Sequence, residues 1–195
     1  AGGNECPTPL HRIEGSTLQP VAQHAATQLL RSGLNGILLL ARPDGLVVQG
    51  ANDEQLIAYP PPAAPEKLVR LVQEGPGRYW AGLAGRPSFR YADGQWSKPD
   101  QYGLPLREAA SASNGDGHVW LSYSNNRIFD FSPAGVHEYN AASGVDVRVA
   151  QFLDVQRETL ASGDGGLQVL SGGRFRHVRV ADPDVLAGIN GVLVA

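Results

Sequence analysis

The chain has 195 residues, of which 42% are hydrophobic and 18% charged, and its formal net charge is −3. This length suits one ordinary domain with its own core, or several small repeated units. The 14 arginines and two lysines are scattered, and the longest apolar run, 37–41, is far shorter than the roughly 20 residues of a membrane helix. The sequence therefore predicts neither a nucleic-acid partner nor a membrane span.

The cysteine count indicates that no internal disulfide forms. Cys6 is the single cysteine, and no Cys/His cluster has the spacing of a metal site. We therefore expect no metal and no cofactor, in a chain suited to either the cytosol or the periplasm. The small residues Ala1, Gly2 and Gly3 fit the start of a processed exported protein, or simply an arbitrary boundary.

The sequence repeats every 40 residues. Four large apolar residues mark the spacing: Leu40, Trp80, Trp120 and Leu160. Glycine-rich turns precede most of these anchors, and a second apolar segment and another turn follow each of them. The repeat predicts units of roughly 26–65, 66–105, 106–145 and 146–185, and the start of a further unit at 186–195.

Each unit reads as four short strands. Residues before each anchor predict a first strand, at 26–31, 68–73, 108–113, 147–153 and, in the further unit, 188–194. The anchors lie in the second strands, and apolar segments after them predict third and fourth strands. Helical propensity leaves a helical turn at 66–70 as an alternative, but agreement between units favours strands. Four strands in 40 residues is the size of a β-propeller blade.

The two anchoring tryptophans have two interpretations. Either Trp80 and Trp120 fill the space between packed sheets, or they form a stacking platform for a sugar or a base. Because Leu40 and Leu160 hold the same position in the other units, packing is favoured. Trp96, on a fourth strand, is expected at the surface or between blades.

Two stretches resemble a known repeat. Residues 74–83 (EGPGRYWAGL) and 114–123 (NGDGHVWLSY) are similar to the repeat of the two-component regulator propellers. Residues 91–96 (YADGQW), 103–106 (GLPL) and 165–170 (GGLQVL) resemble other parts of that pattern. The first unit departs from it, because it lacks the tryptophan and has 42–45 (RPDG) where the family usually has Gly-Thr.

The resemblance implies an all-β fold of four-stranded antiparallel propeller blades in a periplasmic sensor region of a bacterial receptor. Propellers of this family usually close with about seven blades, which needs roughly 280 residues at this spacing. We therefore expect a partial propeller of about four blades, belonging to a longer protein, with a closed ring of four or five blades as the alternative. The remaining blades, the downstream receptor domains and a second copy of the chain are the expected protein partners.

Catalytic signatures are missing from the sequence. There is no nucleophile elbow, no His-Glu-x-x-His helix and no phosphate loop, and the five histidines stand singly. The aspartates beside glycines, such as Asp93 and Asp164, are expected to shape turns rather than to bind calcium. Glu74 with Asp154 is the one notable carboxylate pair for acid/base chemistry.

Propeller geometry points to the central channel as the binding site for a small-molecule or polymer ligand. Alternation along the first strands of three units selects the polar residues that would face this channel: Arg70, Gln73, Glu74, Ser111, Ser113, Asn114, Gln151 and Asp154. A shift of one residue along a strand would place the neighbouring side chains, instead of these, on the channel face.

The main hypothesis is a non-enzymatic, ligand-binding sensor propeller of a two-component-type receptor. The first alternative is a secreted propeller enzyme, a lyase or a glycoside-active protein, that uses channel carboxylates. The second is a protein-binding scaffold of the WD type, but the units lack the Gly-His and Trp-Asp marks of that repeat.

Overall fold

The fold was analysed in a computed structural model of the chain. The structure describes residues 11–14, 16–20, 29–59, 68–107, 109, 111–115, 118–146, 149–155, 158–164 and 166–178. The predicted strand at 188–194 lies outside these residues.

Four antiparallel sheets of four strands each follow one another along the chain. Blade 1 comprises β3 (Leu29–Ser32), β4 (Leu38–Arg42), β5 (Gly45–Gln49) and β6 (Glu54–Ile57). Blade 2 comprises β7 (Leu68–Gly75), β8 (Arg78–Leu83), β9 (Ser88–Ala92) and β10 (Gln95–Ser97). Blade 3 comprises β11 (Ser111–Gly115), β12 (His118–Tyr123), β13 (Arg127–Ser132) and β14 (Gly135–Tyr139). Blade 4 comprises β15 (Val149–Val155), β16 (Glu158–Gly163), β17 (Gly166–Ser171) and β18 (Arg174–His177).

Shorter elements connect or flank the blades. A separate two-stranded hairpin, β1 (His11–Glu14) with β2 (Thr17–Pro20), precedes blade 1. Single 3-10 turns are the only helical elements in the described residues: η2 (Leu34–Gly36), η3 (Pro99–Tyr102) and η4 (Ala141–Ser143).

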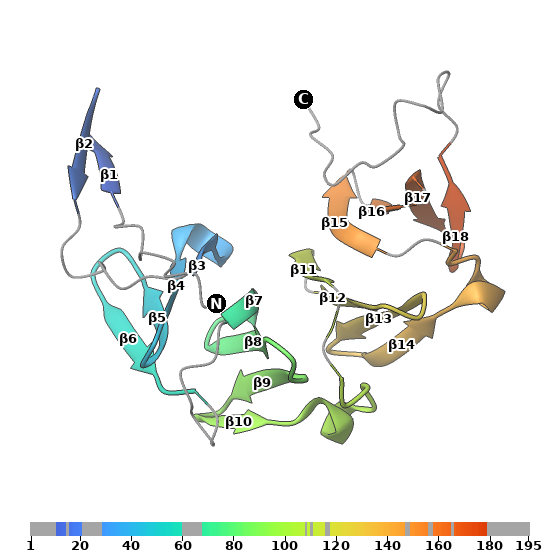
Figure 1. Cartoon of the computed structure of the whole chain (residues 1–195), viewed down its shortest axis with the longest axis horizontal. Coiled ribbons are helices and arrows are strands. Elements are labelled where there is room, and N and C mark those ends of the chain that lie inside the picture. The colour runs from blue at the N-terminus through green and yellow to red at the C-terminus, as the bar shows by residue number, and fades with distance from the viewer. Residues whose placement is uncertain are drawn as a thin grey trace, which may run out of the picture.

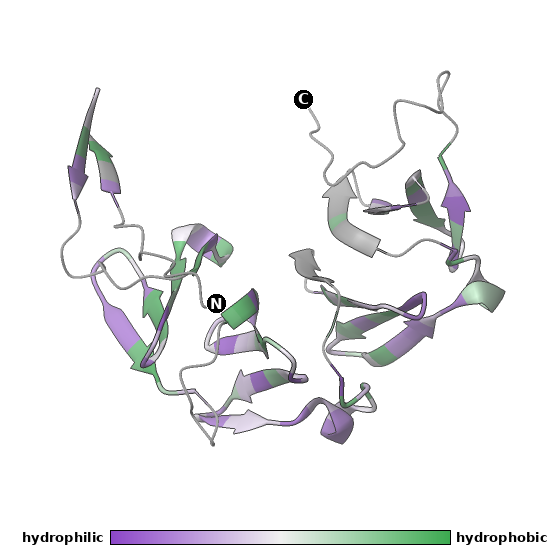
Figure 2. Cartoon of the chain, in the orientation of Figure 1, coloured by the Kyte–Doolittle hydropathy of each residue, from purple (hydrophilic) through white to green (hydrophobic). Residues whose placement is uncertain are grey.

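The blades stand side by side in an open arc (Figure 1). The first strand of each blade lies on the inner side, where β11 contacts both β7 and β15, and the fourth strand lies on the outer side. Outer strands such as β14 and β18 carry mainly hydrophilic residues (Figure 2). The fold is therefore all-β and propeller-like, and the described residues do not form the closed four-blade ring considered above.

The strands agree with the repeat. Each sheet lies inside one of the 40-residue units, and the second strands contain the anchors Leu40, Trp80, Trp120 and Leu160. The segment that kept a helical alternative is a strand from Leu68 onward, because β7 pairs with β8 through most of its length.

Apolar side chains fill the spaces between neighbouring blades. Strands alternate their side chains between two faces, so a central strand packs against both neighbouring blades. Trp80 is 1% exposed and its ring lies 5.0 Å from that of Phe131 in blade 3, between ring centroids. Trp120 is 3% exposed and stacks 5.8 Å from Phe152 in blade 4. Both tryptophans are core residues, as predicted.

Blade 1 departs from the repeat by one residue. Leu39 and Ala41 belong to the apolar cluster shared with blade 2, whereas the expected anchor Leu40 is fully buried on the opposite face of β4. The loop between β3 and β4 spans 33–37, where blades 2 to 4 have two-residue links. Asn35 and Gly36 in this loop have positive φ angles of 56° and 76°. The longer loop accompanies the change of face, which sequence spacing alone does not reveal.

The packing role of Trp120 gives the first prediction. Trp120→Ala removes the ring that joins blades 3 and 4 and should lower the free energy of unfolding by about 3–5 kcal/mol. Urea unfolding measures this loss. Val136→Ala, at a site 36% exposed on the same blade, is the control and should cost less than about 1 kcal/mol. Equal losses for the two variants would contradict the packing role.

Candidate functional site

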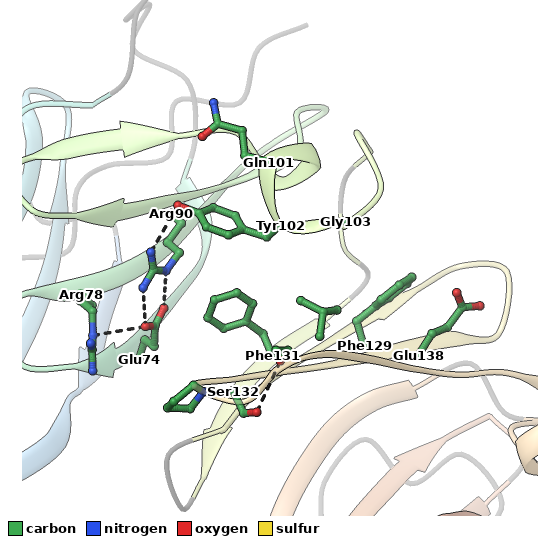
Figure 3. A pocket seen from close by; sticks show the side chains of 13 residues that line it. Glu74, Arg78, Arg90, Gln101, Tyr102, Gly103, Phe129, Phe131, Ser132 and Glu138 are labelled. Atoms are coloured by element: carbon green, nitrogen blue, oxygen red, sulfur yellow. Dashed lines mark hydrogen bonds and ion pairs between the residues drawn. The ribbon is translucent and has the colours of Figure 1, made fainter.

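A cleft of about 790 Å³ lies between blades 2 and 3. Residues beside the β7–β8 and β13–β14 turns line it, and η3 contributes Gln101 and Tyr102 (Figure 3). The lining combines charged and aromatic side chains with a polar turn: Glu74, Arg78, Arg90, Gln101, Tyr102, Gly103, Phe129, Phe131, Ser132, Pro133, Gly135, Val136 and Glu138. A cleft with few, fixed polar groups on an apolar wall is a typical small-molecule site.

The buried carboxylate of Glu74 joins several polar side chains of the cleft wall. Its Oε2 accepts a hydrogen bond from Arg90 Nε at 2.6 Å and another from Trp80 Nε1 at 2.9 Å. Its Oε1 accepts from Arg90 Nη2 at 2.7 Å, and Arg78 Nε lies 3.2 Å away. The side chains of Glu74 and Arg90 are only 8% and 14% exposed. Glu74 and Arg90 therefore form a bidentate ion pair, in which both carboxylate oxygens accept hydrogen bonds.

Local backbone geometry brings these groups together. The β7–β8 register shifts between Gln73 and Gly75, so Glu74 is the extra residue of a β-bulge. A bulge changes the direction of the side chain it carries. Arg90 lies directly opposite Trp80 in the β8–β9 pairing, on the face turned toward blade 3. The guanidinium, the indole N–H and the carboxylate therefore meet in the same gap between blades.

The charges stabilise each other. Burial by itself would raise the pKa of Glu74, but the hydrogen bonds and positive charge of Arg90, with help from Trp80 and Arg78, hold that pKa below its ordinary value of 4.5. The hydrogen bond to Glu74 in turn raises the pKa of Arg90. Glu74 is therefore ionised at neutral pH and has four donor contacts, which makes it a weak general base.

Aromatic rings form the other wall of the cleft. The Arg90 Cζ atom lies 5.1 Å from the ring centroid of Tyr102 and 5.3 Å from that of Phe131. The two rings meet edge to face at 5.6 Å, and the Tyr102 hydroxyl lies 2.8 Å from Ser97 Oγ. The η3 turn places Tyr102 here, and Gly103 ends it with a positive φ of 75°. Arg90 is thus clamped between a carboxylate and two rings.

Gln73, predicted to face the channel, has a different position. Its side chain is 2% exposed, and its Oε1 accepts a hydrogen bond from the Leu34 backbone N–H of blade 1 at 2.6 Å. Its Nε2 donates to the Gly75 carbonyl at 3.3 Å. The prediction for Gln73 was wrong because the side chain connects two blades, and strand alternation cannot tell a gap between blades from the channel.

The other predicted residues lie on inner strands. Arg70 pairs with Gly82 in the β7–β8 register and is half-buried. Five more backbones lie on the adjacent inner strands β11 and β15, and their side chains are outside the described part of the structure: Ser111, Ser113, Asn114, Gln151 and Asp154. Of the eight residues, Glu74 alone lines the described cleft.

The repeat gives a second polar pair one blade further along. His118 and Asp130 stand 40 residues after Arg78 and Arg90, and His118 Nδ1 lies 2.6 Å from Asp130 Oδ1. The His118 ring also stacks on Trp120 at 6.1 Å. The sequence analysis did not select Arg90 or Asp130 as site residues. Each is a charged residue in an otherwise apolar third strand, opposite a buried tryptophan, and this pattern could have indicated a buried polar site. Phe131 and Tyr102 give no such signal, because they join the site only through packing.

Within the described ranges, no three His, Cys, Asp or Glu side chains lie close enough to hold a metal ion. The same part of the chain contains no helix with the length and hydrophobicity of a membrane span.

Comparison with known proteins shows similarity in fold. No family model and no curated protein matches the sequence. Virginiamycin B lyase from Staphylococcus aureus matches with a TM-score of 0.59 and 13% identity, over 87% of this chain and 61% of the lyase. The extracellular domain assigned to the one component system BT4673 of B. thetaiotaomicron matches with a TM-score of 0.56 and 15% identity, over 92% of this chain and 25% of that domain. The extracellular domain assigned to the hybrid two component system BT3049 matches with a TM-score of 0.52 and 13% identity, over 86% of this chain and 25% of that domain.

These neighbours bear out the resemblance to two-component regulator propellers at the level of fold. The chain spans about three fifths of the lyase and a quarter of each extracellular domain. At such low identities the arrangement of blades is shared, and the activities of those proteins are their own.

The bond between Trp80 and Glu74 gives a prediction with a built-in control. Trp80→Phe and Trp120→Phe both shrink a buried ring. Only the first removes a hydrogen bond to a carboxylate, because no described residue accepts a bond from Trp120 Nε1. Trp80→Phe should therefore cost about 1.5–3 kcal/mol more than Trp120→Phe in urea unfolding. Equal costs would show that the Trp80–Glu74 bond adds no stability.

The lowered pKa of Glu74 predicts a pH dependence. Because the folded pKa lies below the unfolded one, Glu74 stabilises the fold above about pH 4.5, and this contribution is lost as pH falls through the folded pKa. Glu74→Gln should cost about 3 kcal/mol at pH 7, since it leaves Arg90 without its partner. The stability gap between wild type and Glu74→Gln should then narrow from pH 6 to pH 3.

Chemical unfolding at several pH values measures that gap. Glu158→Gln, at an exposed carboxylate, is the control and should show no comparable narrowing. A constant gap for Glu74→Gln across the range would mean that the carboxylate is not held ionised by Arg90.

Proposed function

We propose that this chain is part of a non-enzymatic, ligand-binding sensor propeller, located in the periplasm as a region of a bacterial two-component-type receptor. The fold it shares with extracellular domains assigned to such systems supports the proposal. The observation that carries it is the cleft between blades 2 and 3, whose polar groups are already fixed and paired before any ligand binds.

The cleft favours a small polar molecule, or a short part of a polymer, that has one apolar or ring face. The lining carries two acidic and two basic side chains, because Glu74 pairs with Arg90 and Arg78 while Glu138 pairs with Arg127 just outside the lining. Arg78, with a side chain 46% exposed, is the most accessible donor of the Glu74 network, and Phe131 offers an apolar surface. The predicted inner-strand residues form a second proposed contact surface: Arg70, Glu74, Ser111, Ser113, Asn114, Gln151 and Asp154.

The proposed partners of the chain are the remaining propeller blades and the downstream receptor domains. A second copy of the chain is the other partner that an open arc accommodates. An open arc has two terminal blades, each with one face that further blades would cover in a complete propeller. A structural effect of ligand binding at the cleft would reach these partners through blades 2 and 3, which form the two walls of the cleft.

A propeller lyase is the competing function. The fold similarity to virginiamycin B lyase gives it weight, and Glu74 would be its acid/base candidate together with Asp154. The contacts of Glu74 argue against proton transfer, because Arg90, Trp80 and Arg78 surround the carboxylate and hold it ionised. The lyase function would be favoured if the chain converted a substrate and the double variant Glu74→Gln/Asp154→Asn abolished this activity.

Ligand screening tests the sensor proposal. The chain is mixed with small polar metabolites and oligosaccharides, and Tm is followed. A ligand present at about 100 times its Kd should raise Tm by roughly 5–10 °C. The same mixtures are examined by NMR after a day, when an unchanged ligand is the expected result.

A paired substitution locates the binding site. Val136→Trp fills the cleft from a partly exposed outer strand and should abolish the Tm shift. Leu56→Trp, on the outer strand of blade 1 and also exposed, is the matched control and should keep it. If Val136→Trp binds as the wild type does, the ligand site lies elsewhere; if the ligand is converted, the sensor proposal fails.

A further inference from the structure

Glu74, the more buried of the two carboxylates in the cleft lining, has no acceptor capacity left for a ligand. A carboxylate has about four lone-pair positions. The hydrogen bonds from Arg90 and Trp80 occupy three of them, and Arg78 Nε lies beside the fourth, 3.2 Å from Oε1. A donor group of a ligand would have to displace one of these internal partners.

Glu138, the second carboxylate of the lining, is almost as fully occupied. It accepts hydrogen bonds from Arg127 Nε and Nη2 at 2.7 and 2.6 Å, and a third from Asn140 Nδ2 at 3.3 Å. The Arg127 guanidinium also lies 4.9 Å from the ring centroid of Phe129. Both carboxylates of the cleft are therefore neutralised by arginines of their own blades.

Arg78 is the donor that remains open. Its guanidinium forms an ion pair with Glu74 through Nε and donates no hydrogen bond to the described residues, so Nη1 and Nη2 are available to a ligand. By contrast, every nitrogen of the Arg90 guanidinium has a partner in Glu74 or Tyr102. Gly75 leaves room for the Arg78 side chain, because a Cβ at that position would lie 2.8 Å from Nη2.

Positive charge exceeds negative charge around the cleft once the partners of its lining are included. Among the described side chains, Glu74 and Glu138 supply two negative charges, while Arg78, Arg90 and Arg127 supply three positive ones. Each carboxylate forms a bidentate pair with one arginine, so the remaining charge belongs to Arg78. Open donors and surplus charge thus lie on one side chain, and both favour a ligand with a negative charge.

The opposite wall of the cleft offers an apolar surface. Figure 3 shows Arg78 on the wall from blade 2, and Phe131 and Ser132 on the wall from blade 3. Val136 lies opposite Phe131 in the β13–β14 pairing and extends this apolar lining. The side-chain amide of Gln101, from η3, also lines the cleft and forms no hydrogen bond with the described residues.

The gap between blades 3 and 4 does not repeat this arrangement. His118 and Asp130 stand 40 residues after Arg78 and Arg90, and they pair with each other. A carboxylate thus replaces the arginine of the third strand, and it would repel an anion. The donor-rich, positively charged gap in the described residues is therefore the one between blades 2 and 3.

We propose that the ligand of this cleft is an organic carboxylate with an apolar or aromatic body, and that Arg78 binds its carboxylate group. This inference rests on the proposed sensor function and specifies the ligand class of the same cleft. Nη1 and Nη2 of Arg78 donate to the two carboxylate oxygens, a planar geometry that lysine cannot reproduce. The Glu74–Arg90 pair holds the wall beside Arg78 in place, and Phe131 with Val136 contacts the body of the ligand.

Three probes of similar shape and different charge test the ligand class: benzoate, benzamide and benzylamine. Each is titrated into the full chain at pH 7 and constant ionic strength, and Kd is obtained from amide shifts in two-dimensional NMR spectra. Benzoate should bind with a Kd on the order of 1–10 mM, as expected for a ligand of this size. It should bind about 10-fold more tightly than benzamide or benzylamine, because a charge-assisted hydrogen bond is stronger than a neutral one.

Arg78→Gln identifies the side chain responsible for this preference. It should weaken benzoate binding about 10-fold and leave benzamide binding nearly unchanged. Arg86→Gln removes the same charge at the opposite end of β8, so it is the matched control and should keep the preference for benzoate. Arg78→Lys keeps the charge but lacks the planar fork, and its benzoate affinity should lie between those of wild type and Arg78→Gln. It also serves as the second variant if Arg78→Gln does not fold.

The ligand class is overturned if benzoate and benzamide bind equally, if benzylamine binds more tightly, or if benzoate shows no saturable binding up to about 50 mM. The role of Arg78 is overturned if Arg78→Gln, or Arg78→Lys in its place, binds benzoate as the wild type does. Failure of the sensor function has different signs, namely conversion of the ligand or binding that Val136→Trp leaves unchanged.

Discussion

The structure depends on second strands that are buried on both faces. In blade 2, Tyr79 and Ala81 pack toward blade 1 while Trp80 packs toward blade 3, and blade 3 repeats the arrangement with Val119, Leu121 and Trp120. A sheet of this kind has no stable free face, so each blade needs a neighbour on either side. The side-by-side stacking of the blades and the apolar clusters between them follow from this requirement.

The cleft is a polar exception within that apolar packing. Arg90 occupies a position opposite Trp80 in a gap where an apolar residue would fit, and Glu74 reaches it through a bulge. A buried ion pair of this kind contributes little net stability but costs much when one partner is removed. It gives the cleft a rigid, neutral and polar wall, which suits recognition of a ligand better than transfer of a proton.

The fold could be read from the sequence to a large extent. Leu40, Trp80, Trp120 and Leu160 set the repeat, and turn residues set the strand ends, because both signals are local. The site could not be read in the same way. Sequence reasoning selected Gln73 and Glu74 together, yet consecutive side chains of a strand point to opposite faces, so Gln73 bonds to blade 1 while Glu74 reaches the gap toward blade 3.

The sequence by itself determined the repeat of four-stranded sheets and the packing role of Trp80 and Trp120, because apolar spacing and turn residues are local signals. Tertiary structure alone decided which polar residues meet. Tyr102 comes from the η3 connection and Phe131 from β13 of blade 3, and both rings surround Arg90 only when blades 2 and 3 pack together. Contacts across such gaps depend on the positions of whole sheets, which no local pattern encodes.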